Sequence, residues 1–128
     1  MTSNLGTKGY ELTFEERDDY LYALVEGETD NYEISHFYWQ EVIEECKRLG
    51  RKKLLVEEAI IGNNSEGDTF QVASELRSMG LVDIKLAFVD RFTEHDEVNK
   101  FGEMVAINRG IESRVFDRIS EAEEWLRS

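Results

Sequence analysis

The segment from Gly62 to Thr69 (GNNSEGDT) has the spacing of a phosphate-binding P-loop and lies between a predicted strand and a predicted helix. A P-loop needs a lysine at the position that Asp68 occupies in this chain, and Glu66 adds a second negative charge. A nucleotide triphosphate would therefore meet repulsion where it needs a cation. We exclude nucleotide binding by this loop.

Four carboxylates, Glu57, Glu58, Asp68 and Asp90, lie near the carboxyl ends of predicted strands. Carboxylate oxygens bind Mg²⁺, so a metal-assisted hydrolase or phosphotransferase is one hypothesis for this group. Neighbouring residues of a strand point to opposite faces, however, which separates Glu57 from Glu58 unless the strand has ended. Solvated loop acids are the simpler interpretation, and we assign no metal ligand.

The remaining residues with reactive side chains form no catalytic set. His36 and His95 lie on different predicted helices without the spacing of metal ligands, and we expect His95 near a helix start to be exposed. Cys46 lies on the apolar face of a predicted helix and is interpreted as a small core residue. We therefore predict a protein that is not an enzyme and has no cofactor.

Two hydroxyl side chains in the same loop allow a different kind of chemistry. Ser65 and Thr69 lie beside the predicted start of a helix, where the helix end stabilises a phosphate group. Ser65 is the candidate phospho-acceptor. The alternative is structural, with Ser65 in a turn and Thr69 in the first helical turn.

The composition indicates one globular domain. The chain has 128 residues, of which 41% are hydrophobic and 11% aromatic. We predict a flexible N-terminus over residues 1–9 and a single domain over residues 10–128. A net charge of -13 argues against nucleic acids and anionic membranes and favours a basic partner. A single cysteine fits a reducing cytoplasm, and no apolar run approaches the roughly 18 residues of a membrane-spanning helix.

Strands and helices are predicted to alternate along the chain. Gly50, Gly80 and Gly110 each follow a predicted helix, at intervals of about thirty residues, the length of a strand–helix unit. The pattern β-β-α-β-α-β-α-β-α predicts an α/β fold with four helices and a mixed, mainly parallel five-stranded sheet. The predicted elements are strands at 10–14, 20–25, 53–56, 83–90 and 114–116, and helices starting near 30, 68, 93 and 120.

Acidic and hydroxyl residues are predicted to cap these helices. Asp30 is paired with Glu33, and Asp68 with Gln71. Two further pairs are Thr93 with Asp96 and Ser120 with Glu123.

Aromatic residues concentrate on the second strand and the first helix. Tyr20 and Tyr22 lie on the strand, and Tyr32, Phe37 and Trp39 lie on the helix. Core packing is one interpretation. The alternatives are a pocket for a small apolar or lipid-like ligand, and a homodimer that buries Trp39 and Tyr32 across a two-fold axis.

The order of elements and the C-terminal segment resemble the SpoIIAA-like (STAS) family, which includes anti-sigma-factor antagonists. The segment reads Val115-Phe116-Asp117-x-x-x-Glu121-Ala122-x-x-Trp125-Leu126. In the antagonists, a serine before the second helix is phosphorylated by a kinase partner, which breaks the complex. The resemblance implies that Ser65 is the corresponding serine. The chain departs from the family pattern at Asp68, whose fixed carboxylate is an alternative mimic of the phosphorylated form.

Taken together, these patterns predict a non-catalytic cytoplasmic module that regulates or binds a protein partner. The alternative is a carrier or sensor of a small apolar ligand, and the third hypothesis is the metal-assisted enzyme. The predicted binding loop comprises Gly62, Asn63, Asn64, Ser65, Gly67, Asp68 and Thr69.

Overall fold

The computed structural model describes residues 9–128. Apart from Gly9, the predicted flexible N-terminus lies outside these residues. The strands are β1 (Glu11–Glu16), β2 (Leu21–Gly27), β3 (Lys53–Ile60), β4 (Lys85–Asp90) and β5 (Ser113–Phe116). The helices are α2 (Tyr32–Arg48), α3 (Glu66–Glu75), the short 3₁₀ helix η1 (Thr93–His95), α4 (Asp96–Asn108) and α5 (Ile119–Arg127).

The five strands form one sheet in the order β1-β2-β3-β4-β5. β1 pairs antiparallel with β2, and the other neighbouring pairs are parallel. The predicted mixed, mainly parallel α/β sheet is therefore confirmed. Successive strands lie side by side because each crossover helix returns the chain to the same edge of the growing sheet.

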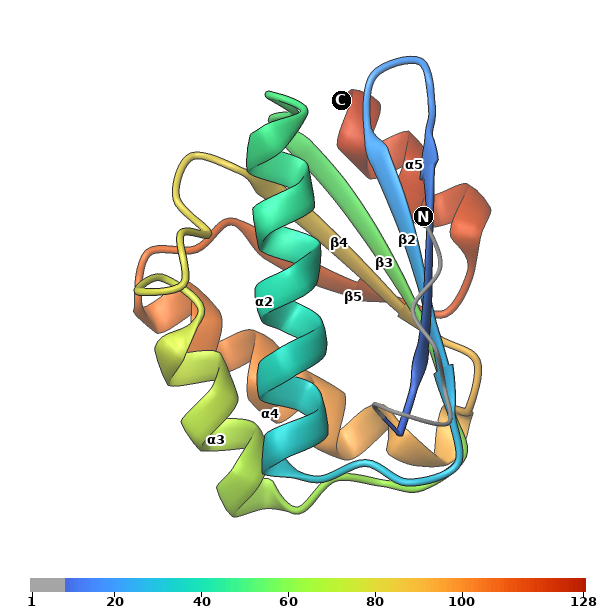
Figure 1. The fold of residues 1–128 in the computed structure, drawn as a ribbon, viewed down its shortest axis with the longest axis vertical. Helices are drawn as coiled ribbons and strands as arrows, with labels where there is room; N and C mark the ends of the chain where they lie inside the picture. Colours follow the sequence, from blue (N-terminus) through green and yellow to red (C-terminus); the bar gives the residue numbers. More distant parts are fainter. Residues whose placement is uncertain (1–8) are drawn as a thin grey trace.

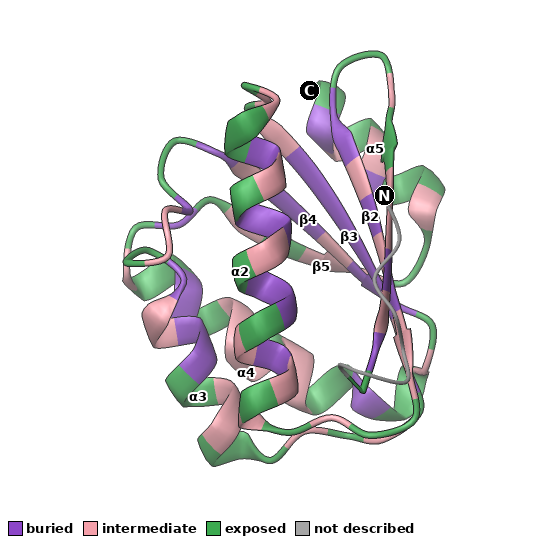
Figure 2. Cartoon of the chain, viewed as in Figure 1, coloured by how far each residue is buried: buried purple, intermediate pink, exposed green. Residues whose placement is uncertain are grey.

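Helices cover both faces of the sheet (Figure 1). α2, α3 and α4 lie on one face, over the larger hydrophobic core, and α5 lies on the other. Figure 2 shows the buried residues concentrated on β3, β4 and the side of α2 that faces the sheet. The larger core includes Tyr38, Val42 and Cys46 of α2, as their helical spacing predicts.

Gly50 and Gly110 end α2 and α4 as expected, but α3 ends at Glu75, and Gly80 closes the turn that follows it. The predicted caps at the helix starts are wrong. Gly50, Gly80 and Gly110 have φ of +68°, +111° and +83°, the left-handed region that favours glycine. At the start of α2, the Asn31 side chain accepts the N–H of Ile34. Asp30 does not cap this helix because its carboxylate accepts the hydroxyl of a serine one turn further on.

The other predicted caps also differ from the structure. α3 begins three residues earlier than predicted, with Ser65 as its N-cap instead of Asp68. The 3₁₀ turn η1 occupies the predicted Thr93 start, so α4 begins at Asp96 without a side-chain cap. α5 begins at Ile119, before the predicted cap at Ser120.

β3 is twice as long as the segment predicted from its apolar run. It continues through Glu57 and Glu58 to Ile60 because β2 and β4 pair with it on both sides along most of its length. Strand alternation then sends the two glutamates to opposite faces of the sheet. Both are buried, so the interpretation of Glu57 and Glu58 as solvated loop acids is wrong.

Two large apolar side chains of the helices are exposed, although helical spacing places them with the core residues. Phe70 of α3 is 46% exposed and Met104 of α4 is 51% exposed. Phe70 stacks on Phe101 of α4 at a ring distance of 6.5 Å, so it packs between the helices near the surface instead of against the sheet. Val72, Ala73 and Leu76 make the buried side of this helical segment.

The face covered by α5 has an apolar part and a polar part. Ala122 and Leu126 of α5 belong to the smaller apolar core. Beside it, Arg17 lies 4.3 Å from the ring centre of Tyr22, whose hydroxyl donates to Glu57. Glu57 also accepts a hydrogen bond from Arg91 at 2.7 Å. This chain of side chains is called the polar row below.

Candidate functional site

The loop before α3 is fixed against the loop that follows β2. The N–H of Ile61 donates to the carbonyl of Gly27 at 3.1 Å, and the N–H of Gly62 donates to the carbonyl of Glu28 at 2.9 Å. A Cβ atom at Gly62 would lie 2.9 Å from that same carbonyl oxygen. Glycine is therefore required at this position by close backbone approach.

The predicted binding loop satisfies its own hydrogen bonds. Asn64 donates its side-chain N–H to the Ser35 hydroxyl at 3.2 Å and accepts the backbone N–H of Ser65 at 3.0 Å. The Ser65 hydroxyl oxygen accepts the N–H of Asp68 at 3.0 Å. Ser65 is exposed and has the extended backbone of an N-cap residue. The candidate phospho-acceptor thus lies at the N-terminus of α3.

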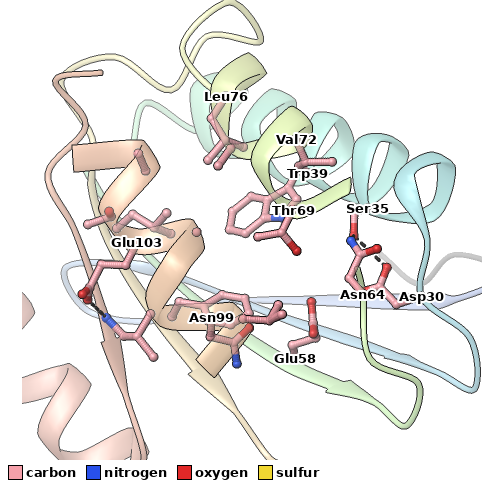
Figure 3. A pocket seen from close by; sticks show the side chains of 18 of the residues that line it. Asp30, Ser35, Trp39, Glu58, Asn64, Thr69, Val72, Leu76, Asn99 and Glu103 are labelled. Carbon is pink, nitrogen blue, oxygen red and sulfur yellow. Dashed lines mark hydrogen bonds between the residues drawn. The ribbon is translucent and has the colours of Figure 1, made fainter. Parts of the chain in front are cut away.

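A cavity of about 100 Å³ lies behind this loop, between the sheet and helices α2, α3 and α4. Three residues of the predicted loop line it, namely Asn63, Asn64 and Thr69. Figure 3 shows Trp39 and Leu76 on the helical side of the cavity and Glu58 on the sheet side. Its apolar lining includes Trp39, Val72, Leu76, Phe88 and Ala106, and its polar lining includes Asp30, Glu58 and Asn99.

A buried polar network adjoins the cavity. Tyr38 donates its hydroxyl hydrogen to Glu58, which is 5% exposed. Asp90 accepts the side-chain N–H of Asn99 at 2.8 Å, and its other oxygen accepts a backbone N–H. Nδ1 of His95 lies 3.1 Å from the same Asp90 oxygen that Asn99 contacts.

His95 is 2% exposed, so the prediction of an exposed histidine is wrong. The 3₁₀ turn η1 directs the ring inward, where Nε2 lies 3.1 Å from the carbonyl oxygen of Ile61. A carbonyl oxygen only accepts hydrogen bonds, so Nε2 carries a hydrogen. Nδ1 can therefore form a hydrogen bond with Asp90 only if a second proton lies either on Nδ1 or on the Asp90 carboxyl group.

Burial raises the pKa of the Glu58 carboxyl well above its usual range, and the nearby charges of Asp30 and Asp90 raise it further. Burial is also the main cause that raises the pKa of Asp30 to about 6. The hydrogen bonds that its carboxylate accepts from Ser35 and a backbone N–H lower this pKa, but by less than burial raises it. Within residues 9–128, no Lys or Arg forms an ion pair with Asp30 or Glu58. In the described part of the chain, His95 is the nearby basic group, with a ligand atom within 4.8 Å of one of Glu58.

The structure brings together only part of the predicted carboxylate group. Glu58, Asp90 and His95 offer ligand atoms within 4.8 Å of one another, which is compatible with a metal ion. Glu57 lies on the opposite face of the sheet in the polar row, and Asp68 lies in the first turn of α3. Glu58 and Asp90 already accept hydrogen bonds, so an ion would have to displace some of their donors.

The five aromatic residues predicted to form a ligand or dimer face do not share one surface. Tyr20 and Tyr22 lie on the face covered by α5, and Phe37 is 52% exposed on α2. Tyr32 donates its hydroxyl to Glu75 of α3 at 2.9 Å. Trp39 is 7% exposed and lines the cavity, so its own chain already buries it.

The other reactive side chains have structural partners. His36 lies 3.2 Å from a carboxylate oxygen of Glu75. Cys46 is buried as predicted, and burial raises the pKa of its thiol to about 11, which disfavours a nucleophilic thiolate.

Comparison with solved structures places the fold. The crystal structure of an anti-sigma factor antagonist from Mycobacterium paratuberculosis aligns with a TM-score of 0.65 and 11% sequence identity, covering 94% of this chain and 97% of the other. This chain has the fold of an anti-sigma factor antagonist. The STAS-like fold implied by the sequence resemblance is thereby confirmed. In this antagonist-like fold, residues 62–65 of the predicted binding loop lie directly before α3, and residues 66–69 form its first turn.

A second solved structure, the NMR structure of the protein TM1081, aligns with a TM-score of 0.48 and 19% identity, covering 89% of this chain and 86% of the other. No protein-family model matches the chain, and no curated protein does. No helix of the antagonist-like fold within residues 9–128 is long and apolar enough to cross a membrane.

Proposed function

We propose that this protein is a non-catalytic regulatory module that binds a protein partner through the loop before α3. The surface comprises Gly62, Asn63, Asn64 and Ser65 before α3, and Gly67, Asp68 and Thr69 in the first turn of α3. The antagonist-like fold supports a regulatory role, because the solved protein with this fold is itself described as an antagonist of another protein.

The observation that carries this proposal is the apolar exposure on both sides of the loop. Ile61, directly before it, is 61% exposed, and Phe70, directly after it, is 46% exposed. Large exposed apolar side chains beside a polar loop are typical of a protein interface. Glu66 and Asp68 make the centre of the surface acidic, so the partner is expected to present basic residues there.

Ser65 is the residue through which phosphorylation would regulate this surface. Its side chain is exposed, and its hydroxyl oxygen already accepts the backbone N–H of Asp68. A phosphate at this position would meet the positive end of the helix dipole but also the carboxylates of Glu66 and Asp68. Phosphorylation would increase the negative charge at the centre of the surface.

Gly67→Arg tests the surface without disturbing the fold. A Cβ atom at Gly67 meets no atom within 4 Å, so the arginine side chain can extend into solvent. Ser120→Arg is the matched control, since it adds the same charge at an exposed position on α5, on the other side of the sheet. The assay is quantitative affinity capture from the native host, followed by mass spectrometry.

We expect Ser120→Arg to retain the partners of the wild-type protein and Gly67→Arg to lose at least one of them. If every partner binds Gly67→Arg as well as it binds the wild type, the assignment of this surface is wrong. Phosphopeptide mapping of the protein from the same cells tests Ser65 separately. A phosphate found only on residues outside the loop would reject Ser65 as the acceptor.

A further inference from the structure

The cavity behind the loop has walls of two different chemical kinds. Figure 3 shows the helical wall formed by Trp39, Val72 and Leu76, with Asp30 at one end of the cavity beside Asn64. Glu58 contributes a carboxyl group from the sheet side. An apolar enclosure with a few convergent polar groups is the usual form of a small-molecule site.

The cavity wall has a third polar group, and this one has no hydrogen-bond partner. Ser113, at the start of β5, lines the cavity, and its hydroxyl oxygen is buried without any hydrogen-bond partner. It is the only such buried side-chain oxygen or nitrogen among residues 9–128. Buried polar groups normally have partners, so an unpaired hydroxyl on a cavity wall indicates a missing ligand atom or water.

The charges of the lining select the class of ligand. The acidic residues Asp30, Glu58 and Glu103 line the cavity, and its single cationic lining residue, Arg114, is exposed. A carboxylate or phosphate ligand would meet like charges, whereas a cation would supply a counter-charge to Asp30 and Glu58, which form no ion pair with Lys or Arg among the described residues. The aromatic ring of Trp39 also favours a cationic or aromatic ligand.

We propose that this cavity binds a small primary amine with a compact apolar body. The ammonium group would be held by Asp30 and Glu58, and the apolar body would pack against Trp39 and the aliphatic side chains of α3 and α4. A polar group at the far end of the ligand would bond with the Ser113 hydroxyl. This inference goes beyond the proposed protein-binding surface and does not depend on it.

Three probes of similar shape and different charge test the proposal: benzylamine, benzyl alcohol and benzoate. A closed cavity of about 150 Å³ in another protein accepts benzene, so this site of about 100 Å³ is tested with a ligand no larger than one substituted ring. Trp125→Phe leaves Trp39 as the single tryptophan, and its fluorescence then reports directly on the cavity. Trp125 packs on the opposite face of the sheet.

We expect benzylamine to change Trp39 fluorescence and to raise the melting temperature at millimolar concentration, and benzoate to do neither. Asp30→Asn and Glu58→Gln should each weaken benzylamine about tenfold, since each removes a charge-assisted hydrogen bond. Ala106→Leu fills the cavity and should abolish binding of every probe. Ala73→Leu fills it from α3 and serves if the first variant does not fold.

Three results would overturn the proposal. The first is benzyl alcohol or benzoate binding as tightly as benzylamine. The second is benzylamine affinity unchanged in both Asp30→Asn and Glu58→Gln. The third is benzylamine binding that persists when the cavity is filled, which would indicate general attraction to an acidic surface. Absence of any response of Trp39 to benzylamine at millimolar concentration would also reject it.

Discussion

Replacing Asp30 by asparagine should stabilise the protein, and by an amount that depends on pH. Burial raises the pKa of this carboxyl from 3.8 to about 6 in the folded state. Below pH 3.8 the group is protonated in the folded and the unfolded chain, so its ionisation costs nothing. As the pH rises towards 6 the unfolded chain loses the proton first, so the folded state becomes progressively less stable.

The size of this effect follows from the difference between the two pKa values. One pKa unit corresponds to about 1.4 kcal/mol, so the folded state loses about 3 kcal/mol by pH 8. Asparagine is neutral at every pH, and its side-chain carbonyl can still accept the Ser35 hydroxyl that Asp30 accepts at 2.7 Å. Asp30→Asn should therefore increase the free energy of unfolding by up to about 3 kcal/mol at pH 8.

Urea denaturation of both proteins at pH 4 and pH 8 measures this difference. We expect a gain of less than about 1 kcal/mol at pH 4 and most of the full gain at pH 8. Asp117→Asn is the control, because it removes one negative charge from an exposed position and should change stability by less than about 0.5 kcal/mol. A gain that is equal at both pH values, or a loss at pH 8, would refute the reasoning.

Three further predictions concern the same region and use urea denaturation. Tyr38→Phe should lower the free energy of unfolding by about 1–3 kcal/mol, because buried Glu58 loses its hydroxyl donor; a loss below about 0.5 kcal/mol would contradict this. Gly62→Ala should cost about 1–3 kcal/mol by steric conflict with backbone, whereas Gly67→Ala should gain up to about 1 kcal/mol; equal effects would disprove the contrast. Ser65→Ala should lower the free energy of unfolding by about 0.5–2 kcal/mol, and Ser65→Asp should lower it much less because aspartate also caps helices; equal losses would contradict the N-cap role of Ser65.

The order of strands and helices along the chain could be predicted from the sequence because the signals that determine it are local. Gly50 and Gly110 mark helix ends through their backbone conformation, Gly80 marks the end of the turn after α3, and the strands between the helices are short apolar runs. The caps were wrong for an equally physical reason. Several polar residues near a helix start compete for its N–H groups, and at α2 the choice depends on where the Asp30 carboxylate bonds.

The candidate site was predictable only in part, because its residues meet across long sequence separations. The position of the loop before α3 follows from the order of elements. The burial of Glu58 and His95 does not, since the partners that make it possible are Tyr38 on α2 and the carbonyl of Ile61. In the sequence alone, a pair of glutamates after an apolar run is typical of the end of a strand.

The cavity could not be predicted from the aromatic pattern either. Trp39 and Tyr22 are both plausible pocket residues by composition, yet β2 directs Tyr22 to the side of the sheet away from α2. Ser113 gave no signal at all, because a serine at the start of a short strand is common. Its significance comes only from the absence of a hydrogen-bond partner for its hydroxyl group.

The polar row of Arg17, Tyr22, Glu57 and Arg91 has a consequence for how the protein responds to dissolved salt. The row covers the part of the sheet beside the apolar contacts of α5, and Arg91 is 47% exposed. Added electrolyte screens such partly exposed ionic contacts, while it leaves apolar packing intact or strengthens it. At high ionic strength, the ionic contacts of the polar row would therefore weaken before the apolar contacts that α5 makes with the sheet.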